Sequence, residues 1–348
     1  MTDRYRYAVA MYDGDGQSPE QVPIEVDWGP AEEWAKFSAI RKAELPPSDS
    51  RARASVHPIW HPKLGRPYTS GFRVRVHGTR EATTDFSAAY FQELAERESY
   101  RLVNSAKLQP GETFRYVVAA FPVETAPREN DGLAVEVEDL SPALPVREGA
   151  LEEVLMASNP HGPVVDSDIP VFVPERVVGE ASDRAREAGA IETGGILVGH
   201  LHRDQRVPEI YAVITEQIPA FHALGDSTRL TFTERTWTDV QAVLDLRRKD
   251  EMMLGWWHSH PVHHWCKKCP VARRRKCPLG SDFLSDHDRA LHRTVFPAAY
   301  SFALVINGIA PDEQTQSLFG WRAGLLRPRG FHVLDGLELG SEPPPRAA

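Results

Sequence analysis

Cysteine is scarce in this chain, with three residues among 348, and all three lie between positions 266 and 277. An odd, clustered count argues against the disulfide scaffold of a secreted protein and favours a reducing compartment. No stretch is apolar over the ~20 residues that a membrane helix needs. The start, Met1-Thr-Asp-Arg-Tyr-Arg-Tyr, is polar and lacks the apolar core of a signal peptide. These absences predict a cytoplasmic protein.

Excess positive charge is also absent, since the formal net charge is −9. Nucleic acid is therefore not the expected partner. Hydrophobic residues make up 41% of the chain and charged residues 26%, which is typical of a globular protein. The length of 348 residues predicts two domains.

Changes in composition along the chain suggest where these domains lie. A strand at residues 4–12, a turn at 13–16, later strands at 72–76 and 114–121, and a helix capped by Thr84 or Asp85 predict a small N-terminal α+β domain. The expected boundaries are residues 1–125 for this domain, a linker rich in Pro, Glu and Asp at 126–166, a second domain at 167–336 and a tail at 337–348. The N-terminal domain is a candidate for recruiting a substrate or partner.

In the second domain, short apolar strands alternate with amphipathic helices. A helix is expected from Pro174 to Gly189, and another after Thr233. Strands are expected around 171–173, 196–198, 209–214, 252–257, 299–306 and 318–322. This order suits an α/β sandwich with a central mixed sheet, although the periodicity alone does not select it.

The most informative motif is His258-Ser259-His260-Pro261, which follows the apolar run Met252–Trp257. Side chains two apart on a strand point to the same side, so the two imidazoles are expected to project together from the strand end. Pro261 ends the strand behind them. Trp256 and Trp257 alternate faces, so one is expected in the core and the other at a substrate groove.

Two carboxylates complete a possible site. Ser285 and Asp288 have the spacing of a helix N-cap, and the same geometry would orient Asp288 as a third ligand. Glu192 precedes Gly194-Gly195 and an apolar strand, where the ordinary interpretation is a surface acid at the strand edge. Two histidines and one aspartate on zinc leave one position for water, as in a catalytic site. Glu192 is then the candidate general base and acid, and Ser285 the candidate oxyanion donor.

Glu192, His258-x-His260-Pro261 and Ser285-x-x-Asp288 together resemble the JAMM/MPN+ (JAB, Mov34/MPN/PAD-1) zinc isopeptidases, in particular their prokaryotic branch. The resemblance covers about residues 168–330 and implies a JAB/MPN-type three-layer sandwich with a central mixed sheet. It implies that His258, His260 and Asp288 ligate catalytic zinc, with Glu192 as base and Ser285 as stabiliser. One departure from the family is the long segment between His260 and Ser285, which contains an insertion at 262–284.

The insertion holds Cys266, Cys269 and Cys277, preceded by His263 and His264. The Cys-x2-Cys spacing, a third cysteine and one of the histidines predict a possible second, structural zinc site. The alternatives are a reduced loop with unrelated thiols and, less favoured, a redox pair. The remaining histidines near the site, including His200, His202, His287 and His292, are interpreted as surface or packing residues, although His287 lies where it can tune the site.

The resemblance implies an isopeptidase or peptidase that cleaves after the C-terminal tail of a ubiquitin-like protein. Precursor processing or deconjugation in a bacterial conjugation pathway with E1-like and E2-like partners is expected, with antiphage defence as one setting. The alternatives are processing of a sulfur-carrier protein and a non-catalytic MPN scaffold. A nucleic-acid module built on the basic cysteine cluster is a weaker alternative, given the net charge of −9.

Overall fold

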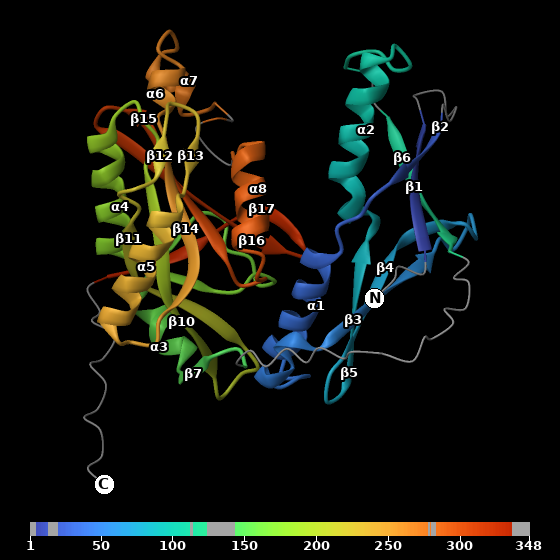
Figure 1. Cartoon of the computed structure of the whole chain (residues 1–348), viewed down its shortest axis with the longest axis horizontal. Coiled ribbons are helices and arrows are strands. Elements are labelled where there is room, and N and C mark those ends of the chain that lie inside the picture. The colour runs from blue at the N-terminus through green and yellow to red at the C-terminus, as the bar shows by residue number, and fades with distance from the viewer. Residues whose placement is uncertain are drawn as a thin grey trace. The chain divides into compact units, whose positions relative to one another are not determined.

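The computed structural model describes residues 5–12, 20–111, 114–123, 143–277, 279 and 283–335 (Figure 1). The predicted turn at 13–16, the first part of the predicted linker and the predicted tail lie outside these residues. The chain divides into two compact units, one of residues 1–144 with 323–325 and one of residues 145–322 with 326–348. Among the described residues, no helix is long and apolar enough to cross a membrane.

The first unit contains a six-stranded antiparallel sheet in the order β2-β1-β6-β4-β3, with β5 also paired to β4. Its strands are β1 Tyr5–Tyr12, β2 Glu20–Ile24, β3 Arg53–Trp60, β4 Tyr68–His77, β5 Glu81–Ser87 and β6 Arg115–Pro122. The helices are α1 Gly29–Arg41 and α2 Gln92–Asn104, and two short 3-10 turns span Pro47–Arg51 and Ala88–Phe91. An aromatic cluster forms the core: Trp28 contacts Phe72 at 4.7 Å and Tyr7 at 5.0 Å between ring centroids.

The prediction that a helix starts at Thr84 or Asp85 is wrong. Both residues lie in β5, which pairs with β4 along its whole length, and Asp85 binds Arg73 at 2.6 Å. The helix begins only at Gln92, after a 3-10 turn capped by the Ser87 hydroxyl. Strand pairing therefore outweighs the local capping signal.

The second unit is built on a ten-stranded mixed sheet in the order β17-β16-β15-β14-β10-β11-β9-β18-β8, with β7 also paired to β10. The strands are β7 Val146–Gly149, β8 Ser158–His161, β9 Val171–Pro174, β10 Gly194–Asp204, β11 Ile210–Pro219, β14 Met252–His260, β15 Phe302–Ala310, β16 Glu313–Arg322, β17 Leu325–Arg329 and β18 Phe331–Leu334. A separate hairpin joins β12 Leu224–Gly225 to β13 Leu230–Thr231. The mixed sheet and its α/β class were predicted; the three-layer sandwich stays a prediction.

The helices of this unit are α3 Leu151–Met156, α4 Glu175–Ala188, α5 Glu234–Arg247, α6 Val262–Trp265, α7 Val271–Arg274 and α8 Asp286–Val295. Helix α4 ends at Gly189, which has a positive φ of 64°, and Thr233 caps α5 with a capping box. Both ends are where the sequence predicts them.

The C-terminal part of the predicted linker is not a linker. Residues 146–161 form β7, α3 and β8, and both strands belong to the sheet of the second unit. A short helix, Leu151–Met156, lies between the two strands. The strands are four residues long and rich in polar residues and proline, so their sequences carry little strand signal.

Candidate metal centre

Strand β14 delivers the two histidines to a buried position. It lies between β10, to which it is antiparallel, and β15, to which it is parallel. His258 is 0% exposed and His260 1%. Their Nε2 atoms lie 2.9 Å apart, so both ring edges converge on one point, as the spacing predicts.

Helix α8 brings Asp288 to the same point. Its Oδ2 lies 3.5 Å from His258 Nε2 and 3.7 Å from His260 Nε2. Ser285 is the N-cap: its Oγ accepts from Asp288 N at 3.1 Å and donates to Asp288 Oδ2 at 2.7 Å. The capping box is thus also the device that orients the carboxylate, so the structural and functional interpretations of Ser285-x-x-Asp288 coincide.

The protonation states of these groups suit a cation. Burial lowers the pKa of His260 to about 4, which leaves its ring neutral with a free lone pair. Burial alone would raise the pKa of Asp288, but His258, His260 and Ser285 hold it well below its usual value. Among the described residues, only His258, His260 and Asp288 form a set of three or more possible ligands whose atoms all lie within 4.8 Å. Two histidine nitrogens and one carboxylate oxygen fit the donor set of an open zinc site.

Glu192 lies beside this group and is not a surface residue, since it is 4% exposed. Its neighbour Thr193 is held against the strand end: Ser259 N donates to Thr193 O at 2.8 Å, and Thr193 N donates to Ser259 Oγ at 3.0 Å. Burial raises the pKa of Glu192 to about 7, opposed by His258 and reinforced by Asp288. A carboxyl group with this pKa can both accept and release a proton near neutral pH.

Gly194 and Gly195 permit this close approach of β10 to β14. A Cβ on Gly194 would lie 2.4 Å from Trp257 O, and one on Gly195 would lie 2.5 Å from Trp257 Nε1. Larger residues would push β10, which follows Glu192, away from β14, which carries His258.

Asn307 is a site residue that the sequence analysis missed. It is fully buried on β15, directly opposite His260 in the β14–β15 register. In the described part of the chain, neither His260 Nδ1 nor Asn307 Oδ1 has a well-formed hydrogen bond. A metal on Nε2 would place the His260 proton on Nδ1, next to this acceptor. Asparagine in an otherwise apolar strand was the available signal.

The two tryptophans correct another expectation. Trp256 and Trp257 are both 0% exposed, so neither borders a substrate groove. Trp256 stacks on His258 at 4.5 Å, and its Nε1 donates to His292 Nδ1 at 3.1 Å. His292 is therefore a buried support for the site, and burial lowers its pKa to about 3.

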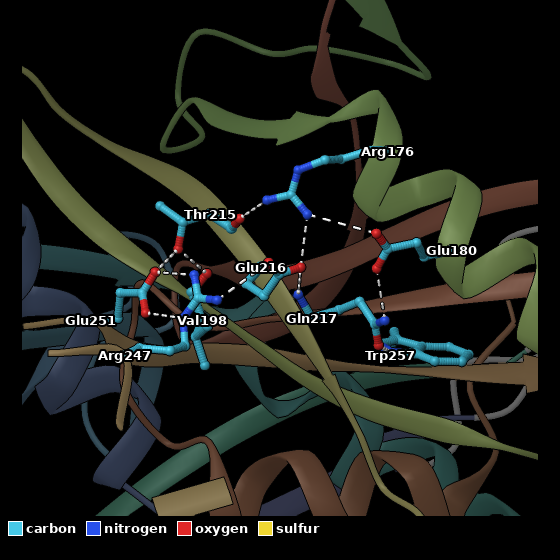
Figure 2. A network of polar contacts seen from close by, with 9 residues as sticks. All are labelled: Arg176, Glu180, Val198, Thr215, Glu216, Gln217, Arg247, Glu251 and Trp257. Carbon is cyan, nitrogen blue, oxygen red and sulfur yellow. Dashed lines mark hydrogen bonds and ion pairs between the residues drawn. The ribbon is translucent and has the colours of Figure 1, made fainter. Parts of the chain in front are cut away.

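Trp257 follows Trp256 on β14, so its side chain is on the opposite face of the strand, where it anchors a polar network (Figure 2). Its Nε1 donates to Gln217 Oε1 at 3.2 Å, and Gln217 Nε2 donates to Glu180 on α4 at 3.0 Å. The network continues through Glu216 to Arg176 and Arg247. It braces β11 and β14 from the side opposite the candidate centre.

The insertion supplies two aromatic rings to His260. Trp265 lies 5.1 Å from the His260 ring and Phe283 lies 5.6 Å from it. The Trp265 indole also donates to the Ser227 carbonyl in the 224–231 hairpin. His287 contacts the same hairpin, with Nε2 3.1 Å from Leu230 O.

A pocket of about 340 Å³ opens at the end of β14. Ser259, His260 and Pro261 line one side, and the end of α4 lines another. Glu192 and Asp288 do not line it. Of the residues at the candidate centre, His260 is the one that lines this pocket among the described residues.

The predicted second zinc site is not preformed. Cys266, Cys269 and Cys277 are free and partly exposed. Their thiols and the rings of His263 and His264 do not form a set within 4.8 Å among the described residues.

This fold and site define a mixed α/β domain with a buried His-His-Asp centre. Residues 174–265 match the family described as prokaryotic homologs of the JAB domain, which supports a prokaryotic JAB/MPN relationship for this part of the second unit. The match includes Glu192 and the His pair but ends before Ser285 and Asp288, which are brought to the centre by the fold. The solution structure of protein DSY2949 from Desulfitobacterium hafniense is 20% identical, covering 48% of this chain and 95% of that one with a TM-score of 0.34. None of the curated proteins matches the chain.

Proposed function

We propose that the second unit is a zinc-dependent peptidase or isopeptidase that cleaves after the tail of a ubiquitin-like protein. The convergence of His258, His260 and Asp288 beside Glu192 carries this proposal, because it combines an open ligand set with a proton carrier. The prokaryotic JAB match supports the reaction class. The substrate class comes from the resemblance of the motifs to the JAMM isopeptidases.

The three ligands would hold a zinc ion, which supplies Lewis-acid chemistry when bound. Glu192 takes a proton from the attacking water and later delivers it to the departing amine. Ser285, which donates to Asp288 in this structure, would turn its hydroxyl toward the developing oxyanion. The buried surroundings of Glu192 keep its pKa near neutrality, as such a relay requires.

A second proposal is the setting: a bacterial conjugation pathway with E1-like and E2-like partners, in precursor processing, deconjugation or antiphage defence. Processing of a sulfur-carrier protein is the alternative substrate class. The burial of Glu192 disfavours a non-catalytic scaffold. Burying a carboxyl group costs free energy, and a protein that only binds partners would gain nothing from that cost beside three metal ligands.

The test is cleavage of a ubiquitin-like protein fused to a C-terminal extension, with zinc supplied. The wild type should cleave the fusion, a chelator should stop it and zinc should restore it. Glu192→Gln keeps the size of the side chain but removes the proton carrier, so its rate should fall at least 100-fold, on the order of a lost acid–base catalyst. Glu187→Gln, at an exposed site on α4, is the matched control. Equal rates for the wild type and Glu192→Gln would reject the proposed base.

A further inference from the structure

The loop that follows β14 contains all three cysteines of the chain, and the proposed hydrolysis does not use them. From His263 to Cys277 no side chain is buried. A segment of this length without apolar burial is not ordered by a core of its own.

The backbone of this loop is nevertheless tightly organised. Cys266 and Cys269 flank a turn in which Cys269 N donates to Cys266 O at 2.9 Å. The Arg274 guanidinium closes the turn, with Nε donating to Cys266 O at 3.2 Å and to Cys269 O at 2.8 Å. Its Nη1 donates to Ile309 O on β15 at 3.1 Å, and Cys277 N donates to Arg274 O at 3.0 Å. Arg274 thus ties three parts together: its side chain links the two-cysteine turn to the sheet, and its backbone carbonyl holds the segment of the third cysteine.

The side chains of the loop face one another. Burial raises the pKa of the Cys266 thiol, and Cys277 and Cys269 raise it further, Cys277 also through a hydrogen bond. The rings of His263 and His264 lie 4.1 Å apart. His263 Nδ1 lies 3.0 Å from Gly308 O, and a proton shared there leaves Nε2 free as a ligand atom.

We propose that Cys266, Cys269 and Cys277, with one of the two neighbouring histidines, bind a second zinc ion. Three thiolates and an imidazole are a standard ligand set for a closed, structural zinc site, and two residues between the first two cysteines is its usual spacing. The basic residues around them offset the negative charge of the thiolates: Lys267, Lys268, Arg273, Arg275 and Lys276.

This ion would have a structural role at the first centre. Trp265 is adjacent to Cys266, contacts the His260 ring at 5.1 Å and donates to Ser227 O. Figure 1 shows α6 and α7 at the same end of the unit as the β12–β13 hairpin. Zinc in the loop would fix Trp265 between a ligand of the catalytic centre and this hairpin.

The experiment counts zinc in the full chain, purified in a thiol reductant with zinc supplied. The wild type should carry two zinc ions, while Cys269→Ser and His258→Asn should each carry one and the double variant none. Ala272→Ser, at an exposed, uncharged position on α7 in the same loop, should keep both. An unchanged zinc content in Cys269→Ser overturns the proposal. The count does not depend on hydrolysis, so it stands apart from failure of the proposed function.

Cobalt substitution provides a readout that needs no cysteine variant. Cobalt-loaded His258→Asn should show the near-ultraviolet charge-transfer band of thiolate-bound cobalt, because its remaining ion sits on cysteines. Absence of that band in a folded His258→Asn sample also overturns the proposal. Loss of one zinc ion in His263→Ala or in His264→Ala identifies the fourth ligand.

Discussion

The strand end at His258 and the loop at Cys266 are neighbours in the sequence, yet they present candidate metal-binding residues in opposite ways. At the strand end, the ligands are 0 to 3% exposed and already converge. In the loop, the thiols are partly exposed and do not form such a set. A strand and a capped helix fix side chains without a metal, whereas a loop without a core depends on the ion itself.

The sharpest way to test this contrast is to remove one ligand at the strand end. His258→Asn should lower peptidase activity at least 100-fold, because it removes a ligand itself. Removing only the hydrogen-bond partner of a ligand typically lowers activity about 10- to 100-fold. Cys269→Ser should lower it far less, because the loop only supports the site. The two variants are compared by their cleavage rates with zinc in excess. An equal loss of activity in both would contradict the view that the strand end holds the catalytic ion and the loop only supports it.

The same contrast explains what could be read from the sequence. His258, His260 and Asp288 were predictable because strand alternation and helix capping are local rules, and the fold obeys both. The helices at α4 and α5 followed from their capping residues and apolar spacing.

What the sequence did not predict depends on contacts between distant segments. Asn307 meets His260 only through the β14–β15 register, and Trp265 meets Ser227 only across the insertion. Strands β7 and β8 exist because neighbouring strands offer them hydrogen bonds, not because their sequences favour strands. Burial of both Trp256 and Trp257 likewise required knowing that both faces of β14 are covered.

A smaller effect is expected at Asn307. Changing this residue tests whether His260 is oriented by an acceptor on the neighbouring strand β15. Asn307→Leu removes the acceptor opposite His260 Nδ1, so zinc affinity should fall about 10- to 100-fold. Ser317→Ala keeps Asn307 but removes its other partner, 3.3 Å away, and should change affinity less. Competition with a chromogenic chelator measures both. An unchanged affinity in Asn307→Leu would show that His260 needs no such partner.

His292 tests whether the buried centre is part of the core. Its pKa of about 3 lies below the value near 6.5 of an unfolded histidine, so the unfolded chain binds more protons between these values. Stability from this residue is therefore present above pH 6.5 and is lost as pH falls toward 3, by up to about 1.4 kcal/mol per pH unit. His292→Gln keeps an acceptor for Trp256 and removes the titration. The free energy of unfolding is measured with urea from pH 7 to 4.5, with a chelator present, and it should depend less on pH in the variant. Parallel curves for the two proteins would show that His292 does not cause the loss of stability at low pH.

The smallest effect is expected where the two regions meet, at Trp265. Trp265→Leu keeps an apolar side chain but removes the hydrogen bond to Ser227 O and the ring contact with His260. One hydrogen bond contributes about 1 kcal/mol, so kcat/KM should fall about fivefold, with both zinc ions retained. Trp237→Leu, on α5 away from the insertion, controls for loss of a tryptophan. If the loop only fills space, the two variants should behave alike. If the loop positions the hairpin, Trp265→Leu alone should lower activity, and Cys269→Ser should add little to it, because both changes release the same contact.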